Sequence, residues 1–103
     1  MLPIGSVVYL KEGTQKVMIL SRAPLVTTDE GEQLMFDYAG CMYPSGLEPD
    51  NVLYFNKENI DQIVFEGHRD EQEERWQQLY KRWLEENESK IKRGKVTEAI
   101  EPN

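Results

Sequence analysis

Short apolar runs separated by turn-forming residues occupy the first part of the chain, which is the pattern of short β-strands. Residues 6–11 and 16–20 are rich in β-branched and aromatic side chains, and Gly13 lies between them. A glycine in so short a connection permits the positive φ of a tight turn. We therefore predict a β-hairpin here, followed by a loop over residues 22–32 with a turn at residues 29–32.

Three further strands are expected before the pattern changes. Residues 33–43 form the longest stretch of this kind, and Gly40 interrupts it. Glycine inside a strand often marks a bulge or a place where another backbone approaches closely. Shorter strands are predicted at residues 52–55 and 63–66, and Asn56 between them can cap one turn of helix.

From residue 70 onward the apolar positions follow the i, i+3, i+4 spacing of one helix face. Asp70 with Glu73 has the form of a capping box, and acidic residues precede basic ones along the segment, as the helix macrodipole favours. We predict one amphipathic helix over residues 70–92, ended near Gly94. Its apolar face comprises Trp76, Leu79, Tyr80, Trp83, Leu84, Asn87 and Ile91.

About five short strands followed by one long C-terminal amphipathic helix define the fold class as α+β. We expect a small, bent antiparallel sheet, with a partial barrel as the alternative. The helix is expected to pack its aromatic face across the sheet, and its far end to project beyond a domain of this size. Residues 1–93 are predicted to form a single domain, and residues 94–103 a flexible C-terminal tail.

Composition excludes several classes of protein. The chain has 103 residues with one cysteine, which excludes an internal disulfide framework. Its apolar runs are too short to span a membrane, and its first residues lack the pattern of a signal peptide, so we expect a cytoplasmic protein. Lys plus Arg number 12 and Asp plus Glu 19, for a net charge of -7, which argues against nucleic-acid binding.

Candidate catalytic chemistry is sparse. Cys41 and His68 are the only pair that could supply a thiol nucleophile with a base, but a free cysteine in an apolar strand is ordinarily a small buried hydrophobe. The acidic residues at 29–32 lack the ligand spacing of an EF-hand, and phosphate-binding glycine motifs are absent from the sequence. We therefore predict a protein that is not an enzyme, with no catalytic residue, metal site or cofactor.

The aromatic side chains of the predicted helix are the best candidates for a binding surface. Trp and Tyr are enriched at the centres of protein interfaces, and an apolar helix face left exposed on a small protein indicates a partner. Core packing is the competing interpretation of the same side chains. The predicted protein-binding residues are Trp76, Leu79, Tyr80, Trp83 and Asn87.

Three blocks of the sequence resemble the DUF4176 family. The first is Leu2–Leu10 with Lys16–Ile19, the second is Phe36–Gly46, and the third is Tyr54–Gly67. The blocks occur in the order in which the family has them. Proteins of this family are found in Gram-positive bacteria of the Firmicutes type, often encoded near type VII secretion components and large toxins with an LXG-type N-terminal domain.

The resemblance implies a context more than an activity. It implies a small accessory protein that binds protein, as a chaperone or adaptor for a type VII-secreted LXG toxin. The acidic charge leaves a second hypothesis open, an immunity protein that blocks a basic toxin domain, because charge complementarity favours such association. A homodimer formed through the C-terminal helix is a further open alternative.

Overall fold

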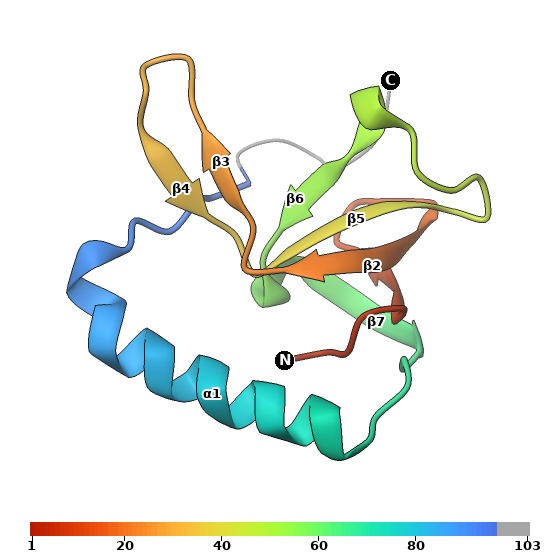
Figure 1. Ribbon diagram of the computed structural model, residues 1–103. Coiled ribbons are helices and arrows are strands. Elements are labelled where there is room, and N and C mark those ends of the chain that lie inside the picture. The colour runs from red at the N-terminus through yellow and green to blue at the C-terminus, as the bar shows by residue number, and fades with distance from the viewer. Residues whose placement is uncertain (97–103) are drawn as a thin grey trace.

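The computed structural model describes residues 1–96 and contains a five-stranded antiparallel sheet, a separate two-stranded sheet and one α-helix (Figure 1). The larger sheet has the order β6-β5-β2-β1-β7, formed by β1 (Val7–Leu10), β2 (Lys16–Arg22), β5 (Tyr38–Tyr43), β6 (Leu53–Phe55) and β7 (Ile60–Phe65). The smaller sheet pairs β3 (Leu25–Thr27) with β4 (Gln33–Met35). The helix α1 spans Glu71–Asn87, and short 3-10 helices lie at Pro49–Asn51, Lys57–Asn59 and Glu88–Lys90. The α+β class is confirmed, and within the described residues the sheet does not close into a barrel.

One face of the larger sheet carries the hydrophobic core. Residues directly opposite each other in antiparallel strands lie on the same face, and Val17 pairs with Val8 on one side and with Met42 on the other. Met1 and Leu2 pack against this face, so the first residues of the chain help to cover it. The core cluster comprises Val8, Leu10, Val17, Ile19, Tyr38, Met42 and Phe55.

The predicted hairpin is confirmed as β1 and β2, whereas the single strand predicted over residues 33–43 is wrong, because it is divided into β4 and β5. The chain leaves the sheet ladder at Phe36 and Asp37. The Phe36 N–H donates to the carbonyl of Pro24 at 3.1 Å, and the Asp37 N–H donates to Oδ1 of Asn56 at 2.9 Å. The Ala23 N–H also donates to the carbonyl of Asp37 at 2.9 Å, so the two arms stay paired across the interruption, and β3 with β4 extends the β2–β5 pair beyond it.

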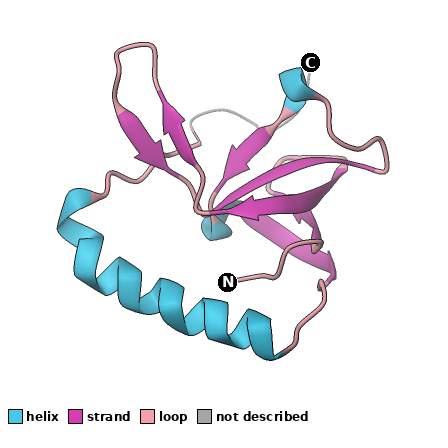
Figure 2. Ribbon diagram, in the orientation of Figure 1, coloured by secondary structure: helices cyan, strands magenta, loops and turns pink. Residues whose placement is uncertain are grey.

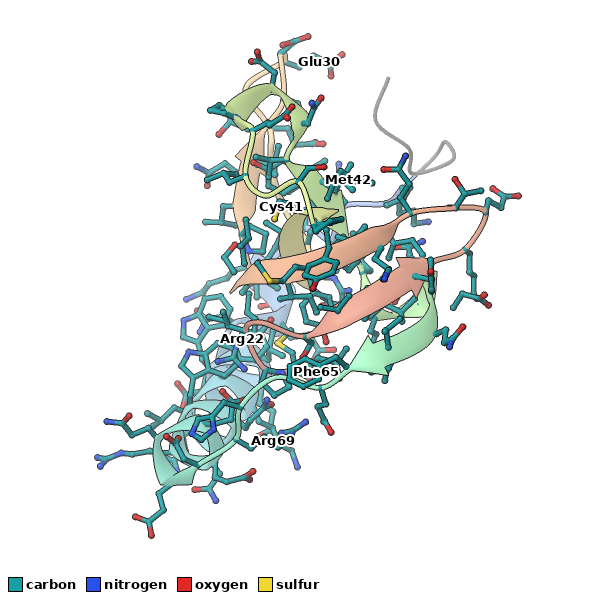
Figure 3. All side chains as sticks on the ribbon, turned by 90° about the vertical axis from the view of Figure 1, so that its right-hand side faces the viewer. Arg22, Glu30, Cys41, Met42, Phe65 and Arg69 are labelled. Carbon is teal, nitrogen blue, oxygen red and sulfur yellow. The ribbon has the colours of Figure 1, made fainter. Side chains whose placement is uncertain are left out.

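The loop predicted over residues 22–32 is wrong in part, because it contains β3. The turn predicted at residues 29–32 is confirmed as the tip of the β3–β4 hairpin, which projects from the rest of the molecule and carries Glu30 (Figure 3). The Thr28 N–H donates to the carbonyl of Glu32 at 2.8 Å, and Gly31 has a φ of 84°. Glycine adopts such a φ without a steric penalty.

The close approach predicted at Gly40 is confirmed. A Cβ atom at this position would lie 2.7 Å from the carbonyl oxygen of Met18 and 2.8 Å from Cγ1 of Val17. The register of β2 against β5 also shifts between Ile19 and Ser21, beside Gly40. An irregularity of this kind increases the local twist of a strand pair, so the glycine lies where the sheet bends.

The helical turn predicted after Asn56 is confirmed as the 3-10 helix Lys57–Asn59. The long helix begins as predicted, because the Asp70 side chain accepts a hydrogen bond from the Glu73 N–H at 3.0 Å. It ends at Asn87, earlier than predicted. The Asn87 side chain donates to the carbonyl of Trp83 at 2.8 Å, and such local side-chain bonds compete with continuation of a helix.

Residues 91–96, which we call the C-terminal strap, return from α1 to the sheets. The Met35 N–H donates to the carbonyl of Lys92 at 2.8 Å, and the Gly94 N–H donates to the carbonyl of Met35 at 2.9 Å. The carbonyl of Gly94 accepts from Nδ2 of Asn56 at 2.8 Å. Of the residues predicted as a flexible tail, 94–96 are therefore described as part of the strap, and 97–103 lie outside the described residues.

Candidate protein-binding surface

The helix α1 lies along the sheet without burying any of its 17 described residues (Figure 2). The predicted burial of its aromatic face is only partial, because the N-terminal residues lie between the helix and the sheet (Figure 1). Gln77 Nε2 donates to the carbonyl of Met1 at 2.7 Å, and the Leu2 N–H donates to the Tyr38 hydroxyl oxygen at 2.8 Å. The first residues of the chain therefore connect one part of α1 to the sheet.

Arg22, at the end of β2, joins the sheet to the start of α1 (Figure 3). Its Nη1 lies 2.6 Å from Oε2 of Glu73, and these side chains are only 6% and 9% exposed. Its guanidinium carbon lies 3.6 Å from the centre of the Trp76 ring, the geometry of a cation–π contact. The hydrogen bond from Arg22 is the main reason that the pKa of Glu73 falls below its usual value.

The five predicted binding residues share one side of α1, as their spacing requires, but they differ in burial. Trp76, Tyr80 and Asn87 are half-buried, whereas Leu79 and Trp83 are exposed, at 52% and 44%. The ring centres of Trp76 and Tyr80 are 4.9 Å apart, and those of Tyr80 and Trp83 are 6.2 Å apart, with near-parallel planes in both pairs. We call Trp76, Tyr80 and Trp83 the aromatic ladder, which runs along one side of the helix from two half-buried rings to the exposed ring of Trp83.

The aromatic ladder holds its exposed end in a fixed orientation. Stacked aromatic rings gain stability beyond their buried area, and a side chain already ordered loses less entropy when a partner binds. Trp83 is the exposed end of this stack, and Leu79 lies one helical turn before it, on an adjacent position of the helix surface. These two side chains are therefore suited to contact a partner.

A groove follows the space between α1 and the rest of the protein, and we call it the α1 groove. It consists of two adjoining hollows of about 480 and 370 Å³ that share Lys81, Leu84 and Arg93 in their walls. The larger hollow is also lined by residues of the sheet face and of the loops around it, among them Asp37, Tyr38 and Lys57. The smaller is also lined by Met35, Glu85, Glu88 and Ile91.

Asp37 anchors the wall of the groove opposite the helix. Its Oδ2 accepts from Nη2 of Arg93 at 3.0 Å and from the Lys57 N–H at 2.9 Å. Asn56 completes this cluster, because its Oδ1 accepts from the Asp37 N–H at 2.9 Å and from Nη2 of Arg93 at 3.2 Å. The cluster links the residue before β5, the segment after β6 and the C-terminal strap. In the sequence, Asp37 and Asn56 are polar residues at the edges of apolar runs, which is a signal for such a cluster. The sequence does not show that the two residues meet.

The pair considered for thiol chemistry is not arranged for it. Cys41 is 1% exposed in the centre of β5, and burial raises the pKa of its thiol, which disfavours the nucleophilic thiolate. The His68 side chain is exposed before α1, with Nε2 3.3 Å from Oδ2 of Asp70. Among residues 1–96, no three His, Cys, Asp or Glu side chains are grouped to hold a metal ion. The described part of the chain also lacks a helix with the length and apolarity needed to cross a membrane.

The open antiparallel sheet, the helix held beside it and the groove between them define a small α+β protein with a half-exposed aromatic helix. This chain belongs to the DUF4176 family. The profile of that family, described as a domain of unknown function, matches residues 1–76, which include both sheets and the start of α1, so the resemblance predicted from the three blocks is confirmed. Neither the curated proteins nor the solved structures contain a match to the chain.

Proposed function

We propose that this protein is a non-enzymatic, cytoplasmic accessory factor that binds another protein, as a chaperone or adaptor for a type VII-secreted toxin of the LXG class. The observation that supports protein binding is the exposure of Leu79 and Trp83. The exposed Trp83 ring is the end of the aromatic ladder, whose other two rings are half-buried. Membership of the DUF4176 family supports the kind of partner, through the secretion context that the resemblance implies.

The helix face has the properties of a binding hot spot. Tryptophan and tyrosine dominate the energetics of protein interfaces, because each buries about 150–250 Å² and needs few rotatable bonds to be fixed. A helix that presents large apolar side chains one turn apart can enter a complementary groove on its partner. We therefore expect Trp83 and Leu79 to be the centre of the interface, with the charged residues around them at its rim.

The proposal is tested with Trp83→Asp. A tagged pull-down from the producing bacterium, followed by mass spectrometry, identifies the partner, and binding of the purified partner is then measured for the wild type and the variant. Because Trp83 is 44% exposed but stacks on Tyr80, we expect the free energy of unfolding to fall by about 0.5–1.5 kcal/mol. The affinity is expected to fall by at least about tenfold.

The matched control is Leu47→Asp, which places the same charge on another exposed apolar residue, remote in sequence from α1 and 62% exposed. It is expected to leave the affinity unchanged. If Trp83→Asp weakens folding as much as binding, or if both variants weaken binding equally, Trp83 is not the centre of the interface.

The net charge of -7 favours one second candidate, an immunity protein that blocks a basic toxin domain, because charge complementarity raises the rate and selectivity of such association. Truncation of the captured toxin separates the two functions. A chaperone or adaptor binds the N-terminal LXG region, whereas an immunity protein binds the C-terminal toxic domain.

A further inference from the structure

We propose that the α1 groove docks an apolar segment of a protein partner and holds a carboxylate of that segment against Lys57, Lys81 and the Tyr80 hydroxyl. The inference rests on the proposed protein-binding function and specifies the chemistry that the partner presents. It also adds a second contact region, between α1 and the rest of the protein, to the exposed residues Leu79 and Trp83.

The charge of the larger hollow is opposite to that of the whole chain. Lys57, Lys81 and Arg93 line it together with one acidic residue, Asp37, which already pairs with Arg93 at 3.0 Å. The ammonium groups of Lys57 and Lys81 have no ion-pair partner among residues 1–96. In a protein with a net charge of -7, two uncompensated cations at one hollow favour a negatively charged group there.

The Tyr80 hydroxyl provides an independent observation at the same hollow. Its oxygen is buried and has no hydrogen-bond partner within the described part of the chain, although Tyr80 lines the larger hollow beside Lys81 and Lys57. Buried hydroxyl groups in folded proteins ordinarily have a partner. Because this oxygen is buried, a carboxylate oxygen can accept from the Tyr80 O–H only when the Tyr80 ring shifts toward the hollow, and it can then contact a lysine ammonium as well.

The second hollow sets the direction of the bound segment. Met35, Leu84 and Ile91 give it an apolar wall, and Glu85 and Glu88 balance the charges of Lys81 and Arg93, which also line it. Apolar side chains of the partner are therefore expected in this hollow, with the carboxylate at the opposite end, near Lys57. A polyanion such as a nucleic acid would find positive charge in the larger hollow only, because Glu85 and Glu88 offset Lys81 and Arg93 in the second, so the charge distribution favours a peptide segment of mixed character.

The test uses two blocked synthetic peptides with the same leucine positions, one with glutamates at one end and the other with lysines in their place. Binding to the full-length protein is followed by tryptophan fluorescence, because Trp76 and Trp83 stack on Tyr80. The glutamate peptide is expected to bind at least about tenfold more tightly than the lysine peptide. Equal binding of the two peptides, or binding of neither, overturns the proposal.

The variants Lys81→Glu and Tyr80→Phe test whether the peptide binds in the α1 groove. Lys81 is exposed, so its replacement is compatible with folding. We expect Lys81→Glu to lower the affinity for the glutamate peptide by about tenfold. Loss of the Tyr80 hydroxyl is expected to cause a smaller loss of affinity. Arg82→Glu is the matched control, because it makes the same charge change on an adjacent exposed residue outside both hollows. If Arg82→Glu and Lys81→Glu have equal effects, the peptide is not in the groove.

The captured partner distinguishes failure of this inference from failure of the proposed function. If Trp83→Asp abolishes binding of the partner and Lys81→Glu leaves it unchanged, the function stands and the groove proposal is wrong. If no partner is captured but the glutamate peptide binds with the expected variant pattern, the groove proposal stands and the accessory function is wrong.

Discussion

Gly94 is the residue that allows the C-terminal strap to pass against Phe36. It is buried, and a Cβ atom there would clash with the Phe36 ring. Gly94→Ala is therefore expected to lower the free energy of unfolding by about 1–3 kcal/mol through overpacking, measured by urea denaturation. Lys95→Ala, at the exposed adjacent position, is the control. Equal effects of the two variants would show that the strap is not packed as described.

Glu73 gives the stability of the protein a specific dependence on pH. Its pKa lies below its ordinary value of 4.5, chiefly because it accepts a hydrogen bond from Arg22. The ion pair therefore stabilises the fold fully above pH 4.5, and this contribution is lost as the pH falls through the lower pKa of the folded state. Glu73→Gln is expected to lower the free energy of unfolding by about 1–3 kcal/mol at neutral pH.

Urea denaturation of the wild type and Glu73→Gln at neutral pH and at a pH near 3 checks this expectation. The difference in the free energy of unfolding between the wild type and Glu73→Gln should be smaller at the acidic pH. Glu74→Gln is the control, because Glu74 is 62% exposed and lies 4.0 Å from Arg69, so it should change stability little at either pH. A Glu73→Gln deficit that does not depend on pH would contradict an ionic contribution from Glu73.

Individual residues were predictable where a local requirement is visible in the sequence. Gly40 interrupts an apolar run, and a close backbone approach is the common reason for such a glycine. Asp70 precedes the helical period and can cap it. Arg22 and Asn56 also meet partners far away in the sequence, Glu73 and Gly94 respectively, and no local pattern reveals these distant contacts.

Secondary-structure elements, like single residues, were predictable where their cause is local in the sequence and not where it depends on distant residues. The β1–β2 hairpin and α1 were predicted because each has its own period and its own turn or cap. β3 was missed because Pro24 precedes it and the run Leu25–Thr27 is short, so only its pairing with β4 reveals a strand. The division of residues 33–43 falls opposite Ala23 and Pro24, where Asp37 is also hydrogen-bonded to Asn56, and a linear pattern contains neither of these distant pairings.

The helix shows how an element can be predicted correctly and its packing only in part. Its spacing predicts which side chains share a face, but the depth to which they are buried depends on what lies opposite. Met1 and Leu2 lie there and pack on the core, so the aromatic ladder stays half-buried. The α1 groove was not predictable for the same reason, since its walls come from segments far apart in the chain.

At the scale of the whole molecule, α1 is attached to the sheet by fewer contacts than the strands make with one another. The five strands share extensive ladders and a buried core, whereas α1 buries none of its described residues. It is attached by the Arg22–Glu73 pair, the Gln77–Met1 hydrogen bond and the strap at its far end. Segments with few buried contacts open at lower free energy than a core, so α1 should separate from the sheet before the sheet unfolds.

Native-state hydrogen exchange tests this expectation. The amides of α1 should open with a free energy at least about 2 kcal/mol lower than those of Val17 and Ile19 in β2. Arg22→Ala should lower the protection of α1 further and leave the two β2 amides protected. Identical opening free energies for α1 and β2 would show one cooperative unit. If α1 opens independently, the half-buried rings of the aromatic ladder and the α1 groove become accessible to a partner segment while the sheet stays folded.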